Sequence, residues 1–100
     1  MIMELAILNI RKGQSQEFED AFRVASTLIS TTKGYIRHGL HRSVEEPDRY
    51  VLLVEWDTLE AHTVRFRQSE VYKEWKALLH RFYEPFPNVE HFSPVLSWPA

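Results

Sequence analysis

The chain has 100 residues, of which 44% are hydrophobic and 26% charged, and these proportions are typical of one soluble globular domain spanning residues 1–100. Twelve basic and fourteen acidic residues give a net charge of -2, whereas proteins that bind nucleic acid usually carry a basic excess to neutralise phosphates. The absence of cysteine excludes disulfides, thiolate metal sites and a cysteine nucleophile. No apolar run reaches the ~20 residues that span a bilayer, and the N-terminal residues lack signal-peptide features, so we expect a cytoplasmic protein without membrane contact.

The first half of the chain predicts a strand, a helix and a second strand. Residues 2–10 are apolar at nearly every position, so we expect a strand that is covered on both faces. From Ser15 to Thr32 the apolar residues recur at spacings of three and four, which predicts an amphipathic helix. We expect Gly34 to end this helix in a left-handed conformation, and residues 35–42 to form the second strand.

The second half predicts a third strand, two helices and a final strand. Residues 49–56 are apolar along both faces and should pair with the second strand as an antiparallel hairpin. Asp57, as the cap, and Glu60, as the third helical residue, have the spacing of a capping box and predict a short helix. Ser69 is the expected cap of a further amphipathic helix. Residues 89–96 are expected to form the last strand, in which a proline favours an edge position.

This order of elements is typical of the split βαβ arrangement that is called ferredoxin-like. We therefore expect an α+β domain whose antiparallel sheet carries helices on one face only. The first and third strands are apolar on both faces, so the other face of the sheet also needs a cover. A second copy of the chain is the simplest source of that cover, which predicts a homodimer with the two sheets packed face to face.

The five histidines are candidates for proton transfer. His62 lies three residues after Leu59 and four before Phe66, so it shares the inward stripe of the short helix. It is either a hydrogen-bonded core residue or a group in a partly hollow interior that takes or holds a substrate proton. His91, on the last strand, is either a polar sheet residue or part of a pocket. The helical period places His80 on the solvent side of its helix.

Aromatic residues at helical spacing form the second group of candidates. Phe66, Tyr72 and Trp75 surround the junction of the two predicted helices. They either fill the core or form the walls of a site for a flat aromatic substrate, with Tyr72 offering a polar tip. Arg65 and Arg67 are expected in solvent, although either could close over an anionic ring.

Five short stretches between residues 49 and 91, together with the order of elements over nearly the whole chain, carry a resemblance to a known family. They are Arg49-Tyr-Val-Leu-Leu-Val-Glu-Trp56, Leu59-Glu-Ala-His62, Phe66-Arg-Gln-Ser69 with Tyr72 and Trp75, Phe82-Tyr-Glu-Pro85, and Pro87-Asn-Val-Glu-His91. In residues and in order, these stretches resemble the antibiotic biosynthesis monooxygenase (ABM) domain family. The resemblance implies a dimeric α/β barrel, built from two ferredoxin-like domains.

The resemblance also implies roles for particular residues. In anthrone-oxidising members, a polar and an aromatic residue four apart on the short helix contact the substrate together with a nearby tyrosine. His62, Phe66 and Tyr72 occupy these positions, with different residue types at the first two. Such members use molecular oxygen without metal, flavin or haem, so we expect neither a cofactor nor a metal. A haem-degrading branch is disfavoured, because Ala6, Phe66 and Trp75 stand in the regions of its asparagine, its tryptophan and its haem-ligating histidine.

The leading hypothesis is therefore a cofactor-independent monooxygenase that oxidises a quinol, anthrone or related phenolic compound. In this hypothesis His62 accepts or orients the substrate proton, and Tyr72 donates a hydrogen bond to the developing oxyanion. The apolar walls and further substrate contacts come from Trp56, Phe66, Trp75 and His91. The alternatives are a non-catalytic dimeric module that binds small molecules or serves in stress, and a cofactor-free isomerase, because all three need an apolar pocket with one titratable group.

Overall fold

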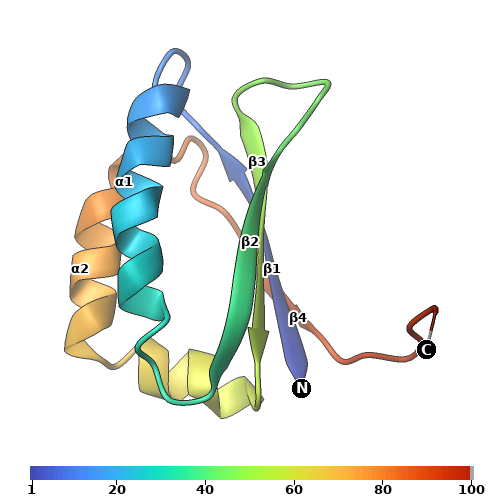
Figure 1. The fold of residues 1–100 in the computed structure, drawn as a ribbon. Helices are drawn as coiled ribbons and strands as arrows, with labels where there is room; N and C mark the ends of the chain where they lie inside the picture. Colours follow the sequence, from blue (N-terminus) through green and yellow to red (C-terminus); the bar gives the residue numbers. More distant parts are fainter. Residues whose placement is uncertain (100) are drawn as a thin grey trace.

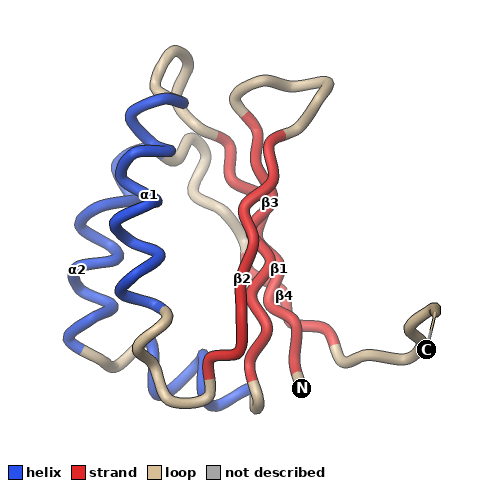
Figure 2. The backbone as a smooth tube through the Cα atoms, in the orientation of Figure 1, coloured by secondary structure: helices blue, strands red, loops and turns tan. Residues whose placement is uncertain are grey.

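Helices cover one face of a four-stranded antiparallel sheet in the computed structural model, which describes residues 1–99 (Figures 1 and 2). The strand order is β2-β3-β1-β4, and α1 and α2 lie against each other on the same side of the sheet (Figure 1). The elements in chain order are β1 (Ile2–Asn9), α1 (Ser15–Ile29), β2 (Tyr35–Arg42), β3 (Arg49–Trp56), η1 (Ala61–Phe66), α2 (Glu70–Leu79), η2 (His80–Phe82) and β4 (Val89–Phe92). No helix in this described range is both long enough and apolar enough to cross a membrane.

This arrangement is the ferredoxin-like α+β fold that the order of elements predicts. β1 lies inside the sheet and pairs along its whole length with β3, from Ile2 opposite Trp56 to Asn9 opposite Arg49. On its other side β1 pairs with β4, and β2 pairs with β3 as the expected hairpin. β2 and β4 are the two edge strands of the sheet. The edge position of β4 agrees with the proline that follows it, since proline is tolerated at the edge of a sheet.

The core lies between the sheet and the helices and is rich in aromatic rings. The ring of Phe18 in α1 packs edge-on against Tyr50 of β3 and Phe82 of η2, with centroid separations of 5.0 and 5.7 Å. Ala6 and Leu8 supply the matching face of β1, and both side chains are fully buried. Burying one such ring contributes about 1.5–3 kcal/mol relative to leaving it exposed, so these contacts hold α1 against the sheet.

The predicted ends of α1 and β4 are wrong. α1 ends at Ile29 instead of Thr32, and Gly34 adopts its left-handed φ of 95° in the turn that leads into β2. β4 ends at Phe92 instead of residue 96, and the chain after it runs away from the sheet (Figure 1). Pro94 explains this early end, because proline has no amide hydrogen with which to extend the pairing to β1.

The sheet face that carries no helix is largely apolar. Met3, Leu5 and Ile7 share this face of β1, and Phe92 lies beside Met3 on the neighbouring strand. Within the single chain Ile7 is 42% exposed and Phe92 is 46% exposed. These exposed apolar side chains lie together on one face of the sheet. They form the surface that the predicted second copy would cover.

Candidate functional site

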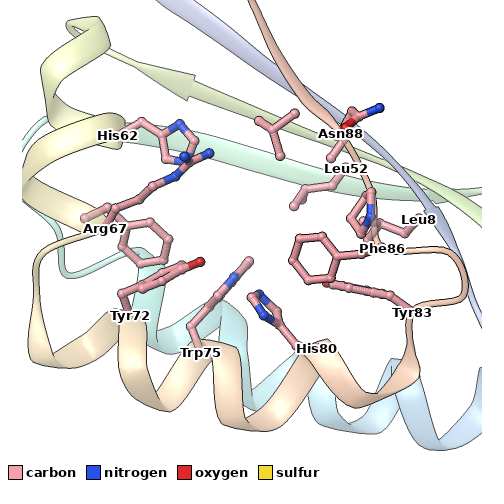
Figure 3. Close-up of a pocket in the computed structure, with 14 residues that line it drawn as sticks. Leu8, Leu52, His62, Arg67, Tyr72, Trp75, His80, Tyr83, Phe86 and Asn88 are labelled. Carbon is pink, nitrogen blue, oxygen red and sulfur yellow. The ribbon is translucent and has the colours of Figure 1, made fainter.

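A cavity of about 300 Å³ lies between the sheet and α2 (Figure 3). Its floor is apolar and consists of Ala6 and Leu8 from β1 and Leu52 from β3. Its walls come from η1, from α2 and from the segment that connects η2 to β4. In Figure 3 the side chains of Tyr72 and Trp75 extend from α2 into this space. An apolar cavity with a few polar groups is the usual form of a small-molecule site.

Four of the six predicted site residues line the cavity: His62, Phe66, Tyr72 and Trp75. The other two, Trp56 and His91, lie outside its lining. The indole of Trp56 is fully buried and stacks against the imidazole of His62, with ring centroids 5.3 Å apart and ring planes 16° apart. His91 contacts the same imidazole from β4. The expectation that Trp56 forms a cavity wall is therefore wrong, because His62 and Phe66 stand in front of it.

The short helix η1 is a π-helix, and its wide turn decides which side chains reach the cavity. The amide of Arg67 donates a hydrogen bond of 3.2 Å to the carbonyl of His62, five residues earlier. His62 and Arg67 consequently lie on the same side of the helix, and both line the cavity. The α-helical stripe predicted from the sequence instead included Leu59, which is 40% exposed. Arg67 is exposed, as expected, and also lines the cavity.

Side-chain caps set the starts of the two helices beside the cavity. The hydroxyl of Thr58 accepts the amide hydrogen of Ala61 at 3.2 Å, so Thr58, and not the predicted Asp57, caps the short helix. Ser69 caps α2 as predicted, because its hydroxyl accepts the amide hydrogen of Tyr72 at 3.1 Å. Each cap of this kind contributes about 1 kcal/mol to helix stability. The Ser69 cap also fixes where Tyr72 enters the cavity.

A chain of polar side chains forms one end of the site. The Nδ1 atom of His62 is hydrogen-bonded to Nε2 of His91 at 2.7 Å, and its Nε2 atom lies 3.4 Å from Oε1 of Glu4. The indole N–H of Trp56 donates to the same carboxyl oxygen at 3.0 Å. The strand register produces this cluster, because Glu4 of β1 lies directly opposite His91 of β4. Both ring nitrogens of His62 therefore lie against other polar side chains.

Burial controls the ionisation of this polar chain. Burial raises the pKa of Glu4 to about 7, against the opposing effects of the Trp56 hydrogen bond and the charge of Arg67. Burial, together with the positive charge of Arg67 and the neighbouring His91, lowers the pKa of His62 to about 3. The contact between Glu4 and His62 consequently joins a carboxyl group that titrates near neutrality to a neutral imidazole, and is not an ion pair.

Aromatic rings hold the opposite wall of the cavity in place. The ring of Phe66 lies 5.2 Å from that of Tyr72 and 5.6 Å from that of Trp75, in near-perpendicular orientations of 79° and 83°. Trp75 packs in turn against Phe22 of α1, with centroids 5.6 Å apart. Edge-to-face packing of this kind adds about 0.5–1.5 kcal/mol per pair beyond area burial. The wall is therefore rigid, while the partly buried Tyr72 presents its hydroxyl toward the cavity (Figure 3).

His80 and Tyr83 extend the polar lining beyond the sequence-based candidates. The helical period places His80 in solvent, but α2 ends at Leu79 and the tighter turn η2 begins at His80. The imidazole is thereby half-buried in the cavity wall, with its ring 4.9 Å from that of Phe86. Burial raises the pKa of the Tyr83 hydroxyl, so this group stays protonated and can donate a hydrogen bond.

Glu4 is missing from the sequence-based candidates, and Arg67 is named there only as a solvent-exposed side chain that could close over an anionic ring. Glu4 shares the strand parity of Ala6 and Leu8, so alternation in an apolar strand was the signal that its carboxyl group faces the core. Arg67 offered no such signal, because the π-helical turn that carries it to the cavity is not visible in the apolar spacing. Among the described residues that line the cavity, Arg67 is the one with a permanent charge.

These features suit a flat, electron-rich ring with an acidic hydroxyl group. The apolar floor and the aromatic wall accept the ring, and the hydroxyl groups of Tyr72 and Tyr83 can donate hydrogen bonds to its oxygens. The guanidinium of Arg67 can stabilise a negative charge at this end of the cavity. Within residues 1–99 no group of three or more His, Asp or Glu side chains is placed to hold a metal ion.

Residues 1–78 match the model of the antibiotic biosynthesis monooxygenase family. Over 95 residues the chain is 61% identical to the uncharacterized protein YczJ of Bacillus subtilis (strain 168), covering 95% of this chain and 100% of that one. A crystal structure from Bordetella bronchiseptica that carries the same family name is 37% identical, with a TM-score of 0.90 over 95% of this chain and 97% of that one. SnoaB of Streptomyces nogalater, described as a cofactor-independent oxygenase, shares the fold with a TM-score of 0.85 at 18% identity, over 99% and 97% of the two chains.

Proposed function

Because the chain belongs to the antibiotic biosynthesis monooxygenase family, we propose that it is a cofactor-independent monooxygenase that oxidises a quinol, an anthrone or a related phenolic compound. One observation carries this proposal: a cavity with an apolar floor and aromatic walls meets a histidine–carboxyl chain at one end. The description of SnoaB as a cofactor-independent oxygenase supports the choice of reaction.

The substrate supplies the electrons in this reaction. Loss of a proton from a phenol or an anthrone leaves a delocalised anion, which can pass an electron to dioxygen. With an anthrone, the ring CH₂ group becomes C=O: one oxygen atom enters the product, and the other leaves as water with the two hydrogens. The protein therefore has to bind the ring, favour loss of the proton and exclude water.

Each of these tasks has a candidate residue in the cavity. Phe66 and Trp75 hold the ring, and the hydroxyl of Tyr72 donates a hydrogen bond to the developing oxyanion. Arg67 stabilises the negative charge of the same oxygen. His62 orients the substrate hydroxyl; its lowered pKa makes the imidazole a poor final holder of the proton.

Oxygen uptake tests the proposal directly. Metal-stripped protein is given a panel of hydroquinones and anthrones, beside a His62→Ala variant and a Tyr72→Phe variant. Val64→Ala is the matched control, because Val64 belongs to the same short helix but is 44% exposed and does not line the cavity. We expect uptake above the uncatalysed rate in wild type and in the control, and a reduction of at least tenfold in the two cavity variants.

Three other results would each point elsewhere. Binding of the panel compounds without oxygen uptake would support the non-catalytic binding module. Rearrangement of a compound without oxygen uptake would support the isomerase. Uptake that is unchanged in both cavity variants would place the reaction outside this cavity.

We also propose that two copies of the chain pack through the helix-free face of the sheet. The support is the exposure of Ile7 and Phe92 on that face, together with the apolar neighbours Met3 and Leu5. Sheets that pack face to face lie about 10 Å apart, so side chains of this size would fill the space between them. Light scattering coupled to gel filtration measures the mass of the assembly in solution.

A further inference from the structure

We propose that Glu4 is the terminal proton acceptor of the cavity and that it acts through His62. This inference rests on the proposed oxygenase function and adds a proton acceptor to it. His91 is hydrogen-bonded to Nδ1 of His62, and a substrate hydroxyl would replace His91 at this nitrogen. Glu4 does not line the cavity, whereas His62 does, so the carboxyl group acts as a positioning and proton-accepting residue behind the imidazole.

The first support is that side chains from four elements meet in one polar cluster. Glu4 comes from β1, Trp56 from β3, His62 from η1 and His91 from β4. Oε1 of Glu4 receives the indole N–H of Trp56 at 3.0 Å and lies 3.4 Å from Nε2 of His62. Nδ1 of that imidazole is 2.7 Å from Nε2 of His91. The imidazole therefore bridges Glu4 to the partly exposed edge strand.

The second support is the depth at which the pair is buried. Glu4 is 6% exposed and His62 is 3% exposed, in a core that is otherwise apolar and aromatic. A carboxyl group in such a place is costly unless hydrogen bonds compensate for its lost hydration. Trp56 supplies such a bond, and every buried side-chain nitrogen or oxygen in the described range has a hydrogen-bond partner. All members of this polar cluster are therefore hydrogen-bonded, although burying the carboxyl group lowers the stability of the domain.

The chemistry that follows is a balanced proton transfer along the chain. A substrate hydroxyl bound against His62 gives its proton to Nδ1, in place of the N–H of His91, while the proton on Nε2 moves to Oε1 of Glu4. The substrate O–H and the imidazole Nε2–H bonds break, and the Nδ1–H and Oε1–H bonds form. The substrate is left as an oxyanion beside Arg67, and the imidazole is neutral before and after the step. Contacts of this kind are often long before the substrate binds, as the 3.4 Å separation is here.

The ionisation of the groups around Glu4 agrees with this direction of transfer. Several titratable or polar groups face Glu4 from the elements packed around it. They are Trp56 of β3, His62 of η1, Arg67 directly after η1, Tyr83 directly after η2, and His91 on the opposite strand β4. Burial raises the pKa of the carboxyl group to about 7, so it can hold a proton at neutral pH. Burial lowers the pKa of the imidazole between them, so it passes a proton on and does not retain it.

Binding of meta-nitrophenol, a weaker acid than the Glu4 carboxyl group, tests this inference without any oxygen chemistry, because the phenolate absorbs visible light and the neutral phenol does not. Wild type, Glu4→Gln and Glu4→Asp are compared at a pH above the carboxyl pKa of about 7, where Glu4 is ionised, and below the pKa of the free phenol. Glu74→Gln is the matched control, since Glu74 is exposed on α2 and does not line the cavity. Calorimetry in buffers with different heats of ionisation counts the protons released to solvent.

We expect wild type and Glu74→Gln to bind the phenolate without releasing a proton, because Glu4 takes it up. Glu4→Gln should bind the neutral phenol, with at least a tenfold smaller phenolate fraction, and Glu4→Asp should restore part of it. Equal ionisation of the bound phenol in wild type and Glu4→Gln would overturn the inference, as would wild type that fails to bind the phenol or binds it neutral. Carbon-13 NMR of wild type is a second measurement that needs no variant to fold: the Glu4 carboxyl signal must shift to its protonated position when the phenol binds.

Oxygen uptake then separates this inference from the proposed function. Ionisation of the phenol by Glu4 without any oxygen uptake would leave the inference standing and remove the oxygenase. Oxygen uptake with the same pH profile in wild type and Glu4→Gln would leave the oxygenase standing and remove the inference.

Discussion

The indole of Trp56 touches both members of the buried proton-transfer pair: it stacks on the imidazole of His62, and its N–H donates to the carboxyl group of Glu4. The ring planes of Trp56 and His62 are 16° apart. Trp56 has no exposure to solvent, so its optical properties depend on the charges of its protein neighbours.

Trp56 should therefore report the ionisation of Glu4. In a background with Trp75→Phe and Trp98→Phe, we expect its fluorescence to change with a midpoint near the carboxyl pKa of about 7, because the acceptor of its N–H gains or loses a full charge. Adding Glu4→Gln should abolish this titration. A midpoint that stays in place in the Glu4→Gln protein would assign the signal to another group.

The stability of the Glu4→Gln variant should depend on pH differently from that of wild type. The pKa of Glu4 is raised in the folded state from 4.5 to about 7, so its stabilising contribution is complete below pH 4.5 and is lost as pH rises through 7. Gln does not ionise, so the variant should gain up to about 3 kcal/mol relative to wild type across that window. Urea unfolding of both proteins at several pH values measures the difference, and a constant difference would mean that Glu4 titrates normally.

Two glycines with positive φ should respond differently to the same substitution. A Cβ atom at Gly34 would lie 2.4 Å from Oδ1 of Asp57 and 2.7 Å from Cβ of Ala61, whereas nothing lies within 4 Å of one at Gly13. Gly13→Ala should cost about 1 kcal/mol, the usual penalty for a left-handed non-glycine residue. Gly34→Ala should cost more and should also displace η1, because Asp57 and Ala61 precede and begin that helix. Thermal unfolding of both variants tests the order, which equal costs would contradict.

Arg67 should govern the affinity for anionic substrates. Arg67→Met removes the permanent charge from the cavity lining while keeping most of the side-chain volume. We expect the apparent affinity for a phenolate or carboxylate ligand to fall by about tenfold, or about 1.4 kcal/mol, with a much smaller effect on a neutral analogue. Arg65→Met is the matched control, because Arg65 does not line the cavity and its guanidinium reaches only the carbonyl of Lys33, at 3.5 Å. Equal losses in the two variants would contradict this role.

A charge on the helix-free face of the sheet should separate the proposed dimer. Ile7→Glu places a carboxylate where the two sheets would meet, and burying it unpaired is unfavourable. Val24→Glu is the control, since Val24 is 55% exposed on α1, on the other side of the sheet. Gel filtration with light scattering should give a dimer for wild type and Val24→Glu and a monomer for Ile7→Glu. A monomeric wild type would remove the dimer proposal.

Alternation and helical period were sufficient to predict the fold, because each element carries its own pattern. The even positions of β1 face the helices and the odd positions face away, as the two apolar faces of residues 2–10 suggest. The same parity places Glu4 in the core, so its burial could have been predicted from the strand alone. Its partners could not, because His62 and His91 come close to it only through the register of β1 with β4 and the path of η1.

The errors in the predicted site arise where one kind of helix gives way to another. An α-helical period was applied to η1, which moved Leu59 into the core and gave no sign that the exposed Arg67 also borders the cavity. The same period was carried past Leu79, which turned His80 away from the cavity that it lines. Neither change of pitch leaves a mark in the hydrophobic pattern, because both segments are short and their few apolar residues fit either geometry.

The wide turn of η1 makes the charge of the cavity depend on helix pitch as well as on residue identity. At the present chain length an ordinary α-helical turn would place Arg67 about 140° around the helix axis from His62, and the arginine would point away from the cavity although it is still present. A change of pitch at this place can thus switch the binding site between cationic and neutral without replacing any side chain.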